Sequence, residues 1–142
     1  MGVVNLSITP GDVAVEDGGT IVKSVQFGSA VTAGEPVYRS SSDGKYRPGD
    51  ASAAATARAI GIVYEAADAD AYGFIVTNGS MDVGATLVPG RAYAVSDTAG
   101  KICAMDSNYE AESGIFITTL GVAVATDQLD VRIQAYGSAI PE

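Results

Sequence analysis

The acidic pair Asp68 and Asp70 is the first place where this sequence could carry chemistry. The two residues are spaced like the first ligands of a calcium-binding loop. Such a loop also needs a third oxygen ligand and, near its end, a Glu that binds through both oxygens. Tyr72 and Gly79 stand at those two positions instead. We therefore interpret Asp68 and Asp70 as part of a solvated turn and predict no metal site.

A second acidic pair, Glu110 and Glu112, would share one face of an extended segment. Paired carboxylates can act as acid and base, but no reactive signature surrounds this pair, so we predict a solvated loop over residues 106–114.

The sequence has no His and a single Cys, Cys103. A His-assisted nucleophile, a His-ligated zinc and an intrachain disulfide are thereby excluded. We expect Cys103 to be a small buried residue, and we expect a protein that is not an enzyme and has no cofactor.

The composition indicates an acidic, strand-rich domain. Val and Ile together number 26 of the 142 residues, against 7 for Leu and Met, and there are 17 Gly. This bias favours strands and tight turns, so we predict an all-β fold, a compact small barrel or sandwich. The net charge of −9 disfavours binding to nucleic acid. No apolar stretch approaches the roughly 20 residues of a membrane span. The start of the chain lacks signal-peptide features, so we expect synthesis in the cytoplasm.

The chain repeats itself, with copies at about 31–80 and 87–138. The segment Gly34–Tyr38 returns 56 positions later as Gly90–Ala94, and the turn at Asp43-Gly44 returns as Ala99-Gly100. Glycine supplies the positive φ that a hairpin tip needs, and Asn78-Gly79 is interpreted as another turn. We predict an internal duplication, each copy with four strands. Turn chemistry shared by accident is the alternative.

Two further segments have a local prediction. The alternation around residues 21–27 predicts a strand. The Ala-rich stretch 50–59 predicts either one or two helical turns, with Asp50 available as the N-cap, or an extended surface loop.

Small residues and glycine turns recur along the chain in a characteristic style. They lie in the segments Ala30–Tyr38, Ser42–Lys45, Asp50–Ala57, Ile60–Ile62, Gly84–Val88, Ala99–Ile102 and Leu120–Ala123. With these segments, the chain from about Leu6 to Pro141 resembles the decoration proteins of tailed bacteriophages, also called cement or head-stabilisation proteins. The loop over 106–114 is longer than is usual for such proteins.

The resemblance implies a structural virion protein. Such proteins are commonly homotrimers that bind the outside of the expanded head, bridge neighbouring capsomers and stabilise the shell. The implied partners are the major capsid protein and further copies of the chain, and the implied location is the outer surface of the capsid. Two other classes stay open. One is another virion β-module, such as a head-fibre base, a tail component or a spike component. The other is a small carbohydrate-binding or enzymatic β-barrel, which the lack of Trp disfavours.

The N-terminal segment is the predicted interface. We expect residues 1–12 to form an extended arm ahead of a single β domain over residues 13–142. The alternation in this arm would place Val4, Leu6 and Ile8 on one apolar face. Adding this strand to a neighbouring subunit or to the major capsid protein would cover that face and satisfy its backbone. The candidate interface residues are Val4, Asn5, Leu6, Ile8 and Pro10. Pairing of the arm within its own subunit is the alternative.

Overall fold

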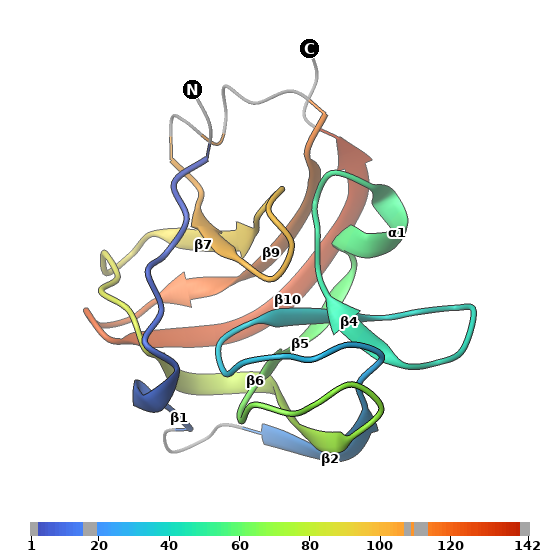
Figure 1. Ribbon diagram of the computed structural model, residues 1–142. Helices are drawn as coiled ribbons and strands as arrows, with labels where there is room; N and C mark the ends of the chain where they lie inside the picture. The colour runs from blue at the N-terminus through green and yellow to red at the C-terminus, as the bar shows by residue number, and fades with distance from the viewer. Residues whose placement is uncertain (1–2, 16–19, 107–108, 110–113, 140–142) are drawn as a thin grey trace.

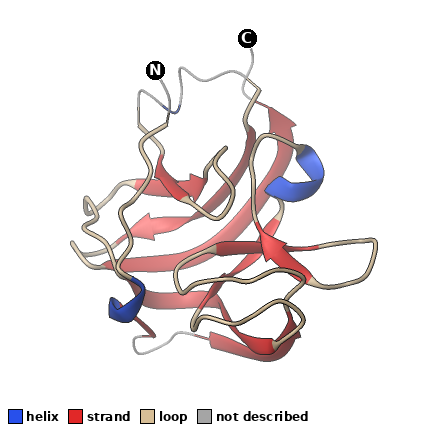
Figure 2. Ribbon diagram, viewed as in Figure 1, coloured by secondary structure: helices blue, strands red, loops and turns tan. Residues whose placement is uncertain are grey.

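The computed structural model describes residues 3–15, 20–106, 109 and 114–139. Strands make up about half of this part and far outnumber helical residues, which confirms the all-β prediction (Figures 1 and 2). No helix within these ranges is long and apolar enough to cross a membrane. The elements are η1 (Pro10–Asp12), β1 (Val13–Val15), β2 (Thr20–Gln26), β3 (Pro36–Arg39), β4 (Tyr46–Pro48), α1 (Ala54–Ala57), β5 (Ala59–Val63), β6 (Tyr72–Val83), β7 (Ala92–Val95), β8 (Ile102–Ala104), β9 (Phe116–Ala123) and β10 (Gln128–Ala139).

The strands of the described part form one antiparallel sheet of ten strands. Its order is β4-β3-β5-β6-β10-β9-β7-β8, and β1 and β2 pair alongside β6. The two longest strands, β6 and β10, pair only where 78–82 of the first faces 128–132 of the second. Before residue 78, β6 pairs with β2 and β5, whereas β10 pairs with β9 from Leu129 to Ala139. The sheet therefore curls around its core like half of a barrel (Figure 1).

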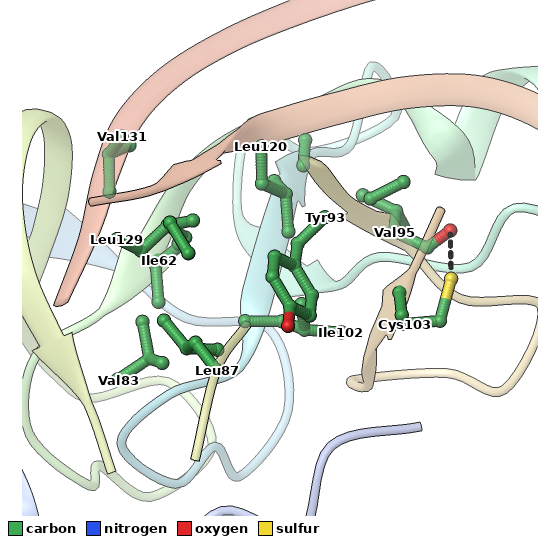
Figure 3. Packing of buried hydrophobic residues seen from close by; sticks show 14 of the residues in the cluster. Ile62, Val83, Leu87, Tyr93, Val95, Ile102, Cys103, Leu120, Leu129 and Val131 are labelled. Atoms are coloured by element: carbon green, nitrogen blue, oxygen red, sulfur yellow. Dashed lines mark hydrogen bonds between the residues drawn. The ribbon is translucent and has the colours of Figure 1, made fainter. Parts of the chain in front are cut away.

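Two hydrophobic clusters hold the sheet. The larger one includes the buried residues Ile62, Tyr93 and Leu120 (Figure 3). The smaller one consists of Val25, Phe27, Val31, Val37, Val63 and Ile75. The consecutive residues Ile75 and Val76 of β6 belong to different clusters. Because successive side chains of a strand point to opposite faces, the two clusters lie on opposite sides of β6.

The two halves of the sheet share one topology. From edge to centre, the first half runs β4-β3-β5-β6 and the second runs β8-β7-β9-β10. The counterparts of β3, β4 and β6 are β7, β8 and β10, and each of these begins 56 positions after its counterpart. Strands β5 and β9 correspond with an offset of 60 (from Gly61 to Gly121, 121 − 61 = 60). The duplication itself stays a prediction, since a shared topology does not establish a shared ancestor.

An irregularity of pairing is also shared by the two halves. The register between β3 and β5 shifts between Val37 and Tyr38, next to Gly61, and the register between β7 and β9 shifts at the matching place next to Gly121. A Cβ atom on Gly121 would overlap the carbonyl oxygen of Asp130 in β10. The glycine therefore lets β9 and β10 approach at the point where the sheet bends.

Two local predictions are wrong. Asn78-Gly79 lies inside β6 rather than at a turn, although Gly79 has φ of +86°. Asn78 pairs with Thr20 of β2 on one edge and with Arg132 of β10 on the other, so the left-handed glycine beside it lies within a continuous strand. The Ala-rich stretch does form a helical turn, but Ala53 is its N-cap. Asp50 lies too far ahead of α1 and accepts hydrogen bonds from the N–H and hydroxyl of Ser52 at 2.9 and 2.6 Å.

Candidate interaction surface

The N-terminal segment lies along β8 of its own chain. The N–H of Leu6 donates to the carbonyl of Ile102 at 2.8 Å, and the N–H of Ala104 donates to the carbonyl of Val4 at 3.0 Å. These bonds place Asn5 opposite Cys103. In the structure, the N-terminal segment therefore pairs within its own subunit and is not an arm detached from the domain. Any role of this segment toward another protein has to use the surface that β8 leaves open.

The side chains of the segment divide between core and solvent. Val3, Leu6 and Ile8 pack against the large hydrophobic cluster, whereas 47% of Val4 is exposed. Of the three residues expected on one apolar face, Leu6 and Ile8 are therefore covered by their own subunit, whereas Val4 is exposed. The segment makes a single bridge with β8 rather than a regular ladder, so its side chains need not alternate strictly. Pro10 is exposed at the start of η1.

The outer edge of the segment is open. Because the backbones of Val4 and Leu6 turn toward β8, the N–H and C=O of Asn5 turn away from it. Neither group has a backbone partner within the described residues. A backbone hydrogen bond also holds the segment at Thr9, whose N–H donates to the carbonyl of Gly84 at 2.7 Å. Val4 and Asn5 thus stand on a fixed edge that a partner strand can extend.

A second exposed surface lies on the C-terminal half of the sheet. A groove of about 420 Å³ runs over β7, β9 and β10, and two large apolar side chains stand at it, Val122 (45% exposed) and Tyr136 (53% exposed). We call it the open face. Its lining residues are Ala92, Thr119, Gly121, Val122, Asp130, Arg132, Gln134 and Tyr136. Sequence reasoning missed this surface, although Val122 stands between two buried residues of β9, Gly121 and Ala123.

Comparing the two halves explains why this face is open. In the first half, the face that bears Val37, Val63 and Ile75 is covered by residues 25–31 in the smaller cluster, and the opposite face enters the larger cluster. In the second half, the counterparts of those three residues enter the larger cluster themselves. The opposite face, with Val122 and Arg132, then has no segment of the described chain to cover it.

The residues that could have carried chemistry have other roles. Asp70 forms an ion pair with Lys45 at 2.7 Å instead of joining Asp68 in a ligand set. Glu110 and Glu112 lie outside the described residues. Cys103 is buried, as predicted, and its thiol donates to the carbonyl of Val95 at 3.8 Å (Figure 3). Burial raises the pKa of this thiol to about 12, so it is not a ready nucleophile. Among the described residues, no three His, Cys, Asp or Glu side chains gather as a metal site.

Comparisons with protein-family models, with curated proteins and with solved structures gave no match.

Proposed function

We propose that this protein decorates the outside of an expanded phage head, where it bridges neighbouring capsomers as a homotrimer. The observation that carries the proposal is the N-terminal segment, which is fastened to β8 and presents Val4 and the backbone of Asn5 outward. This arrangement suits strand addition to the major capsid protein. The resemblance in small residues and glycine turns supports the same role.

The physical properties of the chain fit a cement protein. A cement stabilises a shell by adding interface area that an expanding or bursting shell would have to expose. A net charge of −9 keeps many copies apart in solution before the matching surface forms. It also gives the protein no affinity for the packaged DNA, which it does not need to contact from outside.

The two surfaces serve different contacts in this proposal. In a closed ring of three copies, two different surfaces meet at each contact. The open face, with Val122 and Tyr136, contacts the neighbouring copy, and the N-terminal edge contacts the major capsid protein. The charges of Asp130 and Arg132 in the open face compensate each other, with 3.8 Å between carboxylate and guanidinium. Acidic copies can therefore meet there with little repulsion.

Binding to heads tests the proposal with two matched variants. The change Val4→Glu alters the N-terminal edge, and Val88→Glu places the same charge on a residue that is also 47% exposed but lies elsewhere. We expect the unchanged protein and Val88→Glu to sediment with expanded heads and not with unexpanded heads. Val4→Glu should bind at least tenfold more weakly while its melting temperature stays the same.

Three outcomes would count against the proposal. Failure of the unchanged protein to bind expanded heads would refute the decoration role. Equal binding of expanded and unexpanded heads would refute recognition of the mature surface. Equal weakening by the two substitutions would show that added charge, and not the N-terminal edge, is responsible.

A further inference from the structure

We propose that a groove between the β3–β4 loop and α1 binds a carboxylate-bearing peptide segment of a partner protein. The groove has a volume of about 650 Å³. We call it the arginine groove. Its lining residues are Tyr38, Arg39, Ser40, Ser41, Ser42, Ala54, Ala55, Thr56 and Arg58. In Figure 1 the loop and α1 lie at the right of the molecule, whereas the N-terminal segment lies at the left. The site is therefore separate from the edge that carries the proposed function and does not depend on that proposal.

The charge of this groove is opposite to that of the protein. The chain has 17 acidic and 8 basic residues, yet two arginines and no acidic residue line the groove. Arg39 and Arg58 are both exposed, and neither has an acidic partner among the described residues. A pair of uncompensated guanidinium groups in an acidic protein is a local binding site for negative charge.

The acidic residue of the adjoining loop does not neutralise these arginines. Asp43 is held by Arg47, whose two terminal nitrogens donate to its two carboxylate oxygens at 3.0 and 2.8 Å. These bonds keep the pKa of Asp43 well below its usual range. On the same loop, Lys45 is engaged by Asp70 at 2.7 Å. The neighbouring charges are thus paired with one another, and the field in the groove is that of Arg39 and Arg58.

The walls of the groove fit a peptide better than a small ion. The hydroxyls of Ser40 and Ser42 lie 2.9 Å apart, and Ser41 is exposed beside them, so the loop offers polar groups to a backbone or a carboxylate. Ala54 and Ala55 provide apolar surface on the other wall. The volume is in the range of sites that hold ligands much larger than one anion.

Carboxylate chemistry is favoured over a polyphosphate. A planar guanidinium group donates two parallel hydrogen bonds to a carboxylate. Two arginines can compensate two such groups, whereas the net charge of −9 repels a densely charged nucleic acid. The occupant is therefore an extended segment with one or two Asp or Glu residues.

Nuclear magnetic resonance with a defined probe tests this inference on the full chain. The uniformly 15N-labelled protein is titrated at low salt with hexaglutamate, with hexaglutamine as the neutral control and with inorganic phosphate as the small anion. We expect hexaglutamate to shift the amide signals of Ser40, Ser41 and Ser42 and the side-chain Nε signals of Arg39 and Arg58. Hexaglutamine should leave them in place, and raising the salt concentration should weaken the shifts.

Two double variants with the same charge change separate the groove from net charge. We expect R39Q/R58Q to weaken hexaglutamate binding at least tenfold and R91Q/K101Q to weaken it less than twofold. All four positions lie at the surface or near it, so both variants should keep the melting temperature of the unchanged protein. For comparison, R39K/R58K keeps the charge but loses the forked donors, and it should give an intermediate affinity.

Several results would overturn the proposal. Shifts by hexaglutamate that spread over the whole surface, or no shifts at the loop, would refute a site in the groove. Equal losses in the two glutamine variants would show a general charge effect. Phosphate binding as tight as that of hexaglutamate would show a small-anion site instead. None of these results depends on binding to heads, so the proposed function is tested separately.

Discussion

Two buried tyrosines of one core differ in a single hydrogen bond. Tyr93 and Tyr109 are each 2% exposed and belong to the larger cluster. The hydroxyl of Tyr93 accepts a hydrogen bond from the N–H of Val88 at 2.9 Å. The hydroxyl of Tyr109 has no partner within the described residues, and burial raises its pKa to about 12. The same substitution, Tyr to Phe, should therefore change stability in opposite directions at the two sites.

The expected magnitudes follow from the cost of burying a polar group. Tyr109→Phe removes a hydroxyl that has left water without gaining a partner, so the free energy of unfolding should rise by about 1–3 kcal/mol. Tyr93→Phe removes a satisfied hydrogen bond and should lower it by about 1 kcal/mol. With an unfolding entropy of about 2.1 cal/mol/K per residue, each 1 kcal/mol corresponds to a shift of roughly 3 °C in the melting temperature.

Calorimetry and urea unfolding at neutral pH measure the change in stability of the two variants under the same conditions. We expect Tyr109→Phe to melt at least 3 °C above the unchanged protein and Tyr93→Phe to melt about 3 °C below it, with similar urea m-values. The reasoning is refuted if Tyr109→Phe lowers the melting temperature as much as Tyr93→Phe does. That result would mean that the Tyr109 hydroxyl is satisfied and that its burial carries no penalty.

Three further predictions concern a glycine, a thiol and a carboxyl group. Gly121→Ala should lower the melting temperature more than Gly61→Ala, because its Cβ meets the backbone of Asp130, whereas at Gly61 the Cβ meets a side chain; thermal unfolding compares the two. Cys103 should not react with a thiol reagent at pH 8 until urea unfolds the protein, because it is buried. Burial raises the pKa of Glu35 above 4.5, so the stability that this group contributes is present below pH 4.5 and is lost as the pH rises through the folded pKa. Glu35→Gln should therefore raise the free energy of unfolding at pH 7 but not at pH 3, as measured by urea unfolding.

The strand content and the two hairpin tips were predictable from the sequence. The excess of Val and Ile indicates strands because β-branched side chains fit the pleated, half-buried surface of a sheet. Gly44 and Gly100 have φ of +74° and +77°, and each lies between two strands that pair with each other. Glycine at such a tip is a local requirement of the backbone, so the residue type alone indicates the structure.

The role of Asn78-Gly79 was not predictable from local sequence. The same pair of residues that closes a hairpin elsewhere lies here within a 12-residue strand. What decides between the two is the presence of β2 and β10, which both pair with β6 at Asn78, one on each edge of the strand. Those partners come from distant parts of the chain, so a turn signal alone cannot exclude a bent strand.

The fate of the N-terminal segment also depended on tertiary structure. Its apolar residues and its unpaired backbone groups require a partner edge, and the sequence indicates this need without indicating which edge is nearest. In the folded chain, β8 ends the sheet order and lies beside Val4 and Leu6. The segment therefore covers one edge and presents a new one, which leaves the interface prediction for Val4 and Asn5 to be tested by head binding.

The open face follows from what the two halves do not share. Their strands correspond in order and in register, but residues 25–31 precede only the first half and cover its outer face. No described segment takes that place over the outer face of β9 and β10, where Val122 is 45% exposed. The counterpart of Val122, Ile62, lies on the opposite side of the first half, which is buried in the larger cluster. The outer face of the sheet is thus covered in the first half and open in the second, and the open part is where a covering partner would dock. In an assembly of identical copies, that partner is a second copy, and a charged substitution at Val122 should weaken self-association without lowering the melting temperature of the monomer.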